Sequence, residues 1–232
     1  MPAAASIRTS IIVLLTAMFT LVPAALFAAL QGDPPVRLTL ARVHYQGGGD
    51  WYNGPTEIPN LLDFVGRMTS IQTAQDEAQV KLTDEDLFAY PLLFITGHGN
   101  IRFSDEEVRR LRTYLENGGF LLANDDYGMD APFRREMLRV FPDRQLVELP
   151  PSHGIFQSPF AFPEGLPKVH EHDNKRPQAF GIFHEGRLVV FYAFESDIAD
   201  GWDDPDVHSD PDERRMLALR MGANILTWAL TH

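Results

Sequence analysis

The segment from Pro91 to Asn124 constrains the fold of this chain more than any other. Two continuous apolar runs, residues 92–95 (Leu-Leu-Phe-Ile) and 120–123 (Phe-Leu-Leu-Ala), enclose an amphipathic segment. That segment opens with a capping-box pattern from Ser104 to Glu107, which is typical of a helix start. Buried strands joined by a helix indicate a parallel β-α-β unit whose sheet is covered on both faces. We therefore predict an α/β fold, a three-layer sandwich with a mostly parallel sheet.

The rest of the chain continues this alternation and predicts a single domain from residue 31 to residue 232. We expect further strands at residues 36–45, 79–82, 145–149, 179–183 and 187–194, and further helices that begin at Asn60, near Pro132 and at Asp210. The predicted core faces of the first and last of these helices include Met68 and Leu217. His184-Glu185-Gly186 is a hairpin signal between two of the strands. Residues 150–177 are rich in proline and indicate an irregular loop that covers a site.

The amino-terminal residues predict a segment that directs export. Arg8 precedes an uncharged apolar run from Ile11 to Leu30. This run is longer than the usual core of a signal peptide and close to the roughly 20 residues that span a bilayer. Residues 1–30 are therefore a signal peptide or an N-terminal membrane anchor, with cleavage and retention both open. We expect an exported protein, periplasmic or anchored in the cytoplasmic membrane and facing outward.

Composition excludes two classes of function. The chain has 20 basic and 32 acidic residues and a formal net charge of −12. A surface this acidic repels phosphate backbones, so we expect no binding to nucleic acid. The chain has no cysteine, which excludes both disulfides and a thiol nucleophile.

Polar residues follow the predicted strands and indicate a site. If the strands that end near Tyr45, Ile95, Ala123 and Leu149 are parallel, their carboxyl ends deliver these residues to one edge of the sheet. The predicted ligand-binding residues are Asp50, Trp51, His98, Asn100, Asn124, Asp126, Tyr127, His153, Glu195 and Asp197. His98 lies between two glycines, where its imidazole either contacts a ligand or fixes the loop.

Two adjacent carboxylates, Asp125 and Asp126, follow a predicted strand and precede a helix. Such a pair could hold a cation, act as a base or cap the helix. Capping accounts for one nearby acid, which we expect to be Asp130, and leaves the pair unexplained. Asp125, Asp126 and His98 are therefore the predicted catalytic residues.

His170 and His172 are candidate ligands for a divalent metal ion. On an extended segment, residues two apart point to the same side, so both imidazoles could coordinate zinc or another transition metal. A third ligand would come from His153, Asp126 or Glu195. The alternative is a hydrogen-bonded role at the surface. The acidic run around Trp202 is expected to be mostly a solvated face.

Several motifs in order resemble a known family. They are Gly-Gly-Gly-Asp-Trp-Tyr (47–52), Thr-Gly-His-Gly-Asn-Ile (96–101), Asp-Tyr-Gly-Met-Asp (126–130), Phe-Arg-Arg-Glu (133–136), His-Glu-His-Asp (170–173) and the stretch 201–211. The chain after residue 35 resembles the bacterial domain-of-unknown-function family numbered 4159. The resemblance implies a class I glutamine-amidotransferase-like fold with a flavodoxin-like sheet. It implies envelope partners, namely MoxR-type ATPases and von Willebrand type A proteins.

The resemblance does not carry the amidotransferase mechanism to this chain. Asp126-Tyr127-Gly128 stands where that wider fold has a cysteine turn, and only Glu195 matches its late-strand His-x-Glu motif. The family more usually has Asp-Asp-Asn where this chain has Asn124-Asp125-Asp126, and His-Pro where it has His153-Gly154. We predict an exported, non-amidotransferase module that binds a ligand or assembles with envelope proteins. The alternative is a hydrolase, metal-assisted or not, acting on an envelope carbohydrate or ester.

Overall fold

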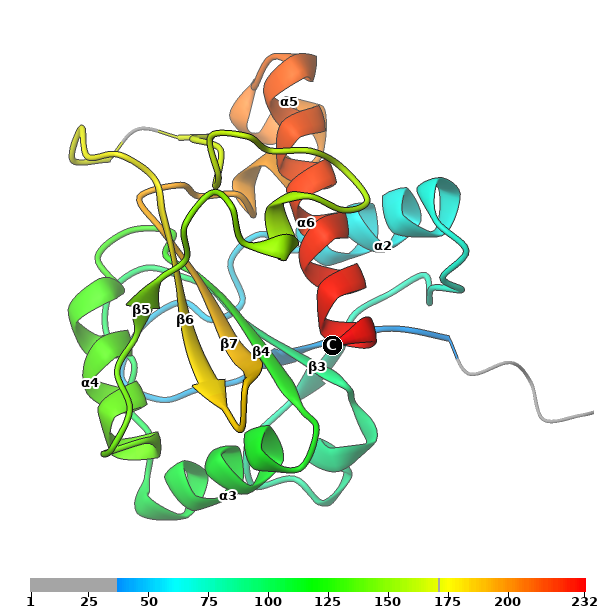
Figure 1. The fold of residues 1–232 in the computed structure, drawn as a ribbon. Coiled ribbons are helices and arrows are strands. Elements are labelled where there is room, and N and C mark those ends of the chain that lie inside the picture. The colour runs from blue at the N-terminus through cyan, green and yellow to red at the C-terminus, as the bar shows by residue number, and fades with distance from the viewer. Residues whose placement is uncertain (1–36, 171) are drawn as a thin grey trace, which may run out of the picture. The chain divides into compact units, whose positions relative to one another are not determined.

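A computed structural model describes residues 37–170 and 172–232, and residues 37–232 form one compact unit. The predicted export segment, residues 1–30, lies outside the described residues. The described residues contain a seven-stranded sheet with the order β2-β1-β3-β4-β7-β6-β5 (Figure 1). The strands are β1 (Leu40–Val43), β2 (Ala78–Val80), β3 (Leu92–Ile95), β4 (Phe120–Asn124), β5 (Val147–Glu148), β6 (Gln178–His184) and β7 (Arg187–Phe194).

The sheet is mostly parallel, as predicted. Strands β2, β1, β3, β4 and β7 are parallel neighbours, and β6 and β5 continue the sheet in antiparallel pairs. The predicted hairpin is confirmed, with Glu185 and Gly186 both at positive φ between β6 and β7. The prediction of a parallel strand that ends at Leu149 is wrong. That segment forms only the short outermost strand β5, which pairs with β6 in the antiparallel direction.

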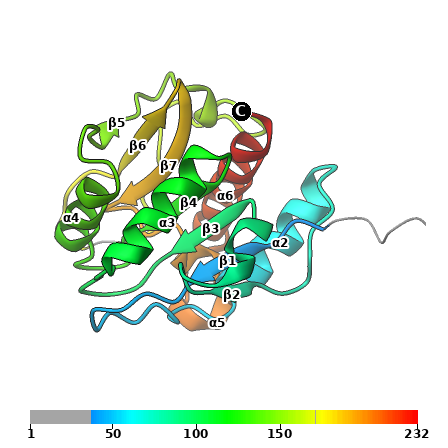
Figure 2. The same ribbon diagram turned by 90° about the horizontal axis from the view of Figure 1, so that it is seen from below.

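Helices cover both faces of the sheet. They are α2 (Glu57–Met68), α3 (Asp105–Glu116), α4 (Asp130–Val140), the short α5 (Pro205–His208) and α6 (Asp212–Thr231). Figures 1 and 2 show α3 and α4 on one side of the sheet and α2 and α6 on the other. Alternate residues of β3 pack on opposite faces of the sheet. Leu92 and Phe94 pack in the core beneath α2 and α6, and Leu93 and Ile95 pack in the core beneath α3 and α4. A mixed α/β fold with helices on both faces is therefore confirmed.

The helix predictions are confirmed at the start of α3 but are wrong at the start of α2 and at two residues assigned to the core. Ser104 and Glu107 form the predicted capping box at the start of α3. However, α2 begins at Glu57 rather than Asn60, and Met68, at its last position, is exposed. Leu217 is also exposed, because α6 buries the face that carries Met221 and Ile225.

Asp210 does not cap α6. The residue before this helix is Pro211, which makes no side-chain capping bond. The Asp210 carboxylate instead lies 2.8 Å from His170 Nε2. Asp210 therefore belongs to a side-chain cluster that the local helix signal does not reveal.

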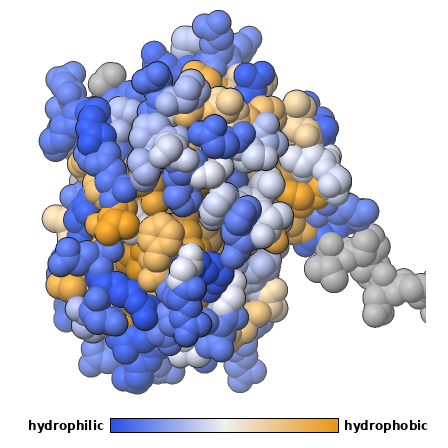
Figure 3. Space-filling model, viewed as in Figure 1, coloured by the Kyte–Doolittle hydropathy of each residue, from blue (hydrophilic) through white to orange (hydrophobic). Residues whose placement is uncertain are grey.

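The described surface is mainly hydrophilic in the view of Figure 3, with an apolar patch over β5 and β6. Within residues 37–170 and 172–232, no helix has both the length and the apolar character needed to cross a membrane.

Candidate functional site

The carboxyl ends of the parallel strands bring three loops together around His98. The His98 Nδ1 atom lies 3.0 Å from Asp50 Oδ2 and 3.2 Å from Asp126 Oδ2. The backbone N–H of His98 also donates to Asp50, and the Asn53 amide donates to Asp126. His98, Asp50 and Asp126 follow β3, β1 and β4, so the parallel sheet gathers residues that are far apart in sequence. We call these residues, with Asn53, the rim.

Gly97 permits this close approach. Its φ is +124°, and a Cβ atom at this position would lie 2.7 Å from the Tyr45 hydroxyl and 2.9 Å from Asp50 Oδ1. The Tyr45 hydroxyl donates to the carbonyl of Thr96 at 3.0 Å. Only glycine combines this backbone conformation with the space that the Asp50 loop occupies.

A buried arginine anchors the loop that carries Asn53. The Arg42 guanidinium donates to the carbonyls of Asn53 (2.6 Å) and Gly54 (2.9 Å). It also pairs with Glu57 at 3.2 Å and with Glu77 at 2.8 Å. A planar guanidinium can satisfy several acceptors in fixed directions, so Arg42 holds the loop in register with Asp126.

Asp125 points away from the rim. Its Oδ1 accepts the N–H of Met129 at 2.8 Å, and its Oδ2 accepts the Tyr192 hydroxyl at 3.1 Å. Burial raises the pKa of Asp125 to about 6. The expected capping role of Asp130 is therefore wrong: Asp125 binds the amide at the start of α4, whereas Asp130 pairs with Arg134 at 2.6 Å.

Asp197 lies between Asn124, at the end of β4, and the histidines His170 and His172. It accepts the Asn124 amide at 3.0 Å, and its Oδ2 lies 3.2 Å from His172 Nε2 and 3.7 Å from His170 Nδ1. Burial alone would raise the pKa of Asp197, but the hydrogen bonds from His170, His172 and Asn124 hold that pKa well below its usual range. Asp197 and its neighbour Glu195 both have positive φ, at 51° and 54°. Such backbone strain in non-glycine residues is concentrated at functional sites.

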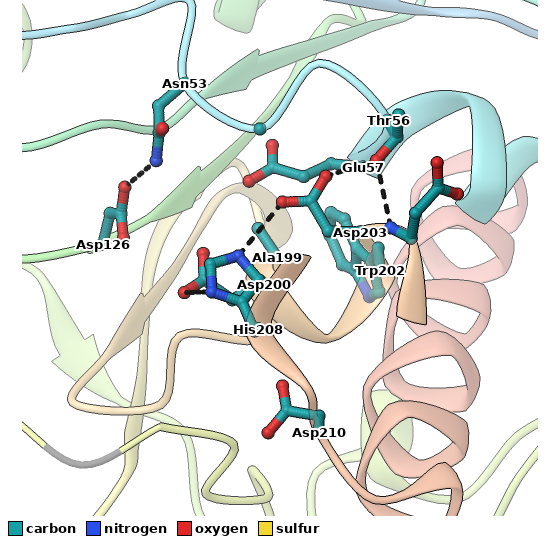
Figure 4. A network of polar contacts seen from close by, with 12 residues as sticks. Asn53, Thr56, Glu57, Asp126, Ala199, Asp200, Trp202, Asp203, His208 and Asp210 are labelled. Atoms are coloured by element: carbon teal, nitrogen blue, oxygen red, sulfur yellow. Dashed lines mark hydrogen bonds and ion pairs between the residues drawn. The ribbon is translucent and has the colours of Figure 1, made fainter. Parts of the chain in front are cut away.

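A second cluster lies beside the rim and is drawn in part in Figure 4. Asp200 Oδ2 is 2.7 Å from His170 Nδ1 and 3.5 Å from His208 Nδ1. Asp203 Oδ2 is 3.2 Å from His208 Nε2. The expectation of a solvated acidic face is therefore wrong for Asp200 and Asp203, which are buried.

Carboxylates of the two clusters lie close to one another. One oxygen from each of Asp126, Asp197 and Asp200 lies within 4.8 Å of the others. Burial, and then the charges of Asp197 and Asp200, raise the pKa of Asp126 to about 8, although His98 and Asn53 oppose this shift. Burial lowers the pKa of His98, but Asp126 and Asp50 outweigh it and raise that pKa above its ordinary value. Perturbed pKa values of this kind are concentrated at functional sites.

Other predicted ligand-binding residues lie around these clusters. Trp51 stacks on His44 with ring centroids 4.2 Å apart, and the Asn100 amide donates to the Gly47 carbonyl at 3.0 Å. A cavity of about 300 Å³ is lined in part by Asp125, Tyr127, His172 and Glu195. The backbone of Tyr127 pairs with that of His98 in an isolated parallel bridge.

His153 lies elsewhere, so its predicted place in this cluster is wrong. Its ring centroid is 4.8 Å from that of Trp228 in α6, and its Nδ1 accepts the N–H of Ile155 at 3.2 Å. The prediction required a parallel strand before His153, whereas β5 is antiparallel and lies at the far edge of the sheet.

The sequence analysis did not predict five polar residues as members of the site. They are Asn53, Asp200, Asp203, His208 and Asp210. Asp203, His208 and Asp210 lie in the stretch 201–211 that resembles the family, but the resemblance gives them no role, and no periodic signal marks any of the five. The proximity of Asp203 to Thr56, at 2.5 Å between side-chain oxygens, depends on segments 147 positions apart. Only the tertiary fold brings these residues together.

Comparison with known proteins gives a family but no function. The search of curated proteins finds no match. A family model described as a domain of unknown function (DUF4159) matches residues 39–230. The match covers every strand and helix named above except the last residue of α6.

Proposed function

The chain belongs to the family DUF4159, a domain of unknown function, and from this premise we propose that it is a binding module for a small hydroxyl-rich ligand. The observation that carries the proposal is the meeting of Asp50, His98 and Asp126 from three loops at the strand carboxyl ends. Ligands of open parallel sheets bind at this edge.

The chemistry of the rim favours a ligand that donates hydrogen bonds. The Asp50 carboxylate is an acceptor, the protonated Asp126 carboxyl keeps an acceptor oxygen, and the negative charge of the chain disfavours anionic ligands. Tyr52 and Tyr127, next to rim residues in sequence, are exposed. A carbohydrate offers hydroxyl groups to these carboxyl oxygens and C–H faces to such rings.

The architecture and the sequence support binding over amidotransfer. We assign the fold to the class I glutamine-amidotransferase-like, flavodoxin-like group, with Asp126 at or near the place of the nucleophile. The absence of cysteine supports a module that has lost the thiol reaction. The apolar run from Ile11 to Leu30 supports export, and hence a carbohydrate or protein partner in the cell envelope.

The test uses N-acetylchitotetraose and its deacetylated form, chitotetraose, as probes in isothermal titration calorimetry. We expect binding of at least one probe, weakened at least tenfold by Tyr127→Ala. Phe88→Ala is the matched control, because Phe88 and Tyr127 are 50% and 49% exposed and Phe88 packs on Tyr114 at the opposite end of the sheet. Absence of binding up to millimolar probe, or equal losses in the two variants, would contradict this proposal.

Hydrolysis is the second candidate, favoured by one observation. Asp126, with its pKa raised by burial to about 8, lies 3.2 Å from His98. Such a pair suits general acid–base chemistry at neutral pH. The test is p-nitrophenol release from p-nitrophenyl acetate and p-nitrophenyl N-acetyl-β-glucosaminide. Turnover lost in a folded Asp126→Asn variant would support hydrolysis, and a rate equal to that of buffer would reject it.

A further inference from the structure

We propose that His170, His208 and Asp200 bind one zinc ion beside the rim. Binding of this ion does not depend on binding of the hydroxyl-rich ligand at the rim. One ligand atom from each of the three residues lies within 4.8 Å of the others, and Nδ1 of each histidine is the ring nitrogen that faces Asp200 Oδ2. Two imidazole nitrogens and one carboxylate oxygen form a donor set typical of zinc. The residues come from the segment before β6 and from the η3 (Asp200–Trp202) and α5 region that follows β7.

The spacing of these atoms fits a small tetrahedral ion. With zinc–ligand bonds of about 2.0–2.1 Å, ligand atoms of a tetrahedral site are about 3.3 Å apart. His170 Nδ1 and His208 Nδ1 lie 2.7 Å and 3.5 Å from Asp200 Oδ2. Small rotations of these side chains would therefore centre an ion.

Both histidines are already oriented as metal ligands are. A metal-bound imidazole commonly donates its other N–H to a carboxylate, which fixes the ring and its tautomer. His170 Nε2 lies 2.8 Å from Asp210 Oδ2, and His208 Nε2 lies 3.2 Å from Asp203 Oδ2. Asp203 is itself held by the Thr56 hydroxyl at 2.5 Å. Each Nδ1 is thereby aimed at Asp200.

The charge around this group favours a dication. Glu57 is fully buried, and its Oε1 has no hydrogen-bond partner. Figure 4 shows its side chain extending from α2 past Asp203 on the side of the cluster. Burial is the main cause of its strongly raised pKa, and Asp203, Asp200 and Asp126 add to the rise although Arg42 opposes it. Glu57 Oε2 contacts the Arg42 guanidinium at 3.2 Å, so its unpartnered Oε1 adds a buried acceptor on the Asp203 side of the cluster and is not itself a ligand.

An ion could enter, and a further ligand position is open. The side chains of His170 and His208 are 21% and 29% exposed, whereas Asp200 is buried behind them.

His172 is not a ligand in this arrangement, although the sequence pairs it with His170. Its Nε2 bonds Asp197 at 3.2 Å, and its ring lies 5.2 Å from that of Tyr127. His172 is therefore a matched control, a histidine two residues from a proposed ligand and of similar exposure.

The experiment measures zinc on the full chain, purified without a histidine tag and stripped with a chelator. Calorimetric titration with Zn²⁺ and elemental analysis should give one ion per chain. We expect His208→Ala to weaken binding at least 100-fold and His172→Ala to weaken it less than threefold. Asp210→Asn, which keeps both imidazoles, should lower affinity about 10- to 100-fold. Circular dichroism checks folding, and Asp210→Asn and Asp203→Asn carry the test if His208→Ala unfolds.

Two results would overturn the inference: no stoichiometric zinc in the wild-type chain, or equal losses in His208→Ala and His172→Ala. Zinc is titrated without oligosaccharide, so this test is separate from that of the proposed function. A chain that binds zinc but binds neither oligosaccharide would support the ion site and contradict the proposed function. A chain that binds an oligosaccharide but no zinc would support the proposed function and contradict the ion site.

Discussion

His98 Nδ1 lies 3.2 Å from Asp126 Oδ2, so an exposed imidazole meets a buried carboxyl at the centre of the rim. Each comes from the turn after a parallel strand, β3 or β4. The raised pKa of Asp126 makes this contact a source of pH dependence in folding as well as in binding.

The first prediction concerns stability against pH in Asp126→Asn. Burial raises the pKa of Asp126 to about 8 in the folded chain, above the value of about 4 expected when unfolded. The folded state therefore holds the extra proton between these values, and wild-type stability falls as pH rises from about 4 to 8. Asparagine removes this loss, so the variant should gain at least about 2 kcal/mol over wild type at pH 8, measured by urea unfolding in chelator.

The control for this prediction is Asp63→Asn, at an exposed aspartate of α2 that pairs with Arg67. Removing this exposed ion pair should change the free energy of unfolding by less than about 1 kcal/mol. If Asp126→Asn gave a constant difference from pH 4 to 8, the ionisation of Asp126 would not be coupled to folding.

A second prediction concerns Arg42→Met. The substitution leaves Glu57 buried without its cation and frees the carbonyls of Asn53 and Gly54. Breaking a buried ion pair in this way should cost about 3–5 kcal/mol of unfolding free energy. Adding Glu57→Gln should recover part of the loss, because glutamine cannot take the charged form that burial disfavours at this position.

Arg67→Met is the matched control for Arg42→Met, since Arg67 pairs with Asp63 at 2.7 Å on the exposed face of α2. It should cost less than about 1 kcal/mol. Similar losses of unfolding free energy in the two arginine variants would show that burial does not determine how much Arg42 contributes to stability.

A third prediction concerns packing below the ion site, in Gly222→Ala. A Cβ atom on Gly222 would lie 2.5 Å from Leu61 Cδ1 and 3.0 Å from the Trp202 ring. Overpacking should cost about 1–3 kcal/mol even though alanine favours helices. Thermal unfolding measures this, and Met216→Ala, at an exposed position of the same helix, should be nearly neutral. A stabilised Gly222→Ala would contradict the tight crossing of α6 with α2 and η3.

Much of the fold follows from local sequence signals. The apolar runs at 92–95 and 120–123 form β3 and β4, and Ser104 and Glu107 start α3 as their spacing indicates. These features depend on neighbours a few residues away. The direction of β5 cannot be predicted from such local neighbours. Its two residues pair with β6 at a sheet edge, and no pattern in them distinguishes parallel from antiparallel pairing.

The site residues that follow parallel strands could be predicted from the sequence. Those that are buried by packing between distant segments could not. His98 and Asp126 meet because parallel strands end at one edge. Asp200 and Asp203 are buried because η3 packs against α2 and α6, and Trp202 donates to the Ala218 carbonyl at 2.9 Å. From the sequence alone, an acidic run of this kind is indistinguishable from a solvated face.

The most direct test of the rim is an NMR titration of the full chain in chelator, following the Asp126 carboxyl carbon and the His98 ring. We expect Asp126 to titrate near 8, because it is buried beside Asp197 and Asp200. We also expect the pKa of His98 to lie above its ordinary value, because Asp126 and Asp50 outweigh burial. An Asp126 carboxyl that titrates near 4, with the pKa of His98 unchanged by Asp126→Asn, would show that the two groups are not coupled in the rim.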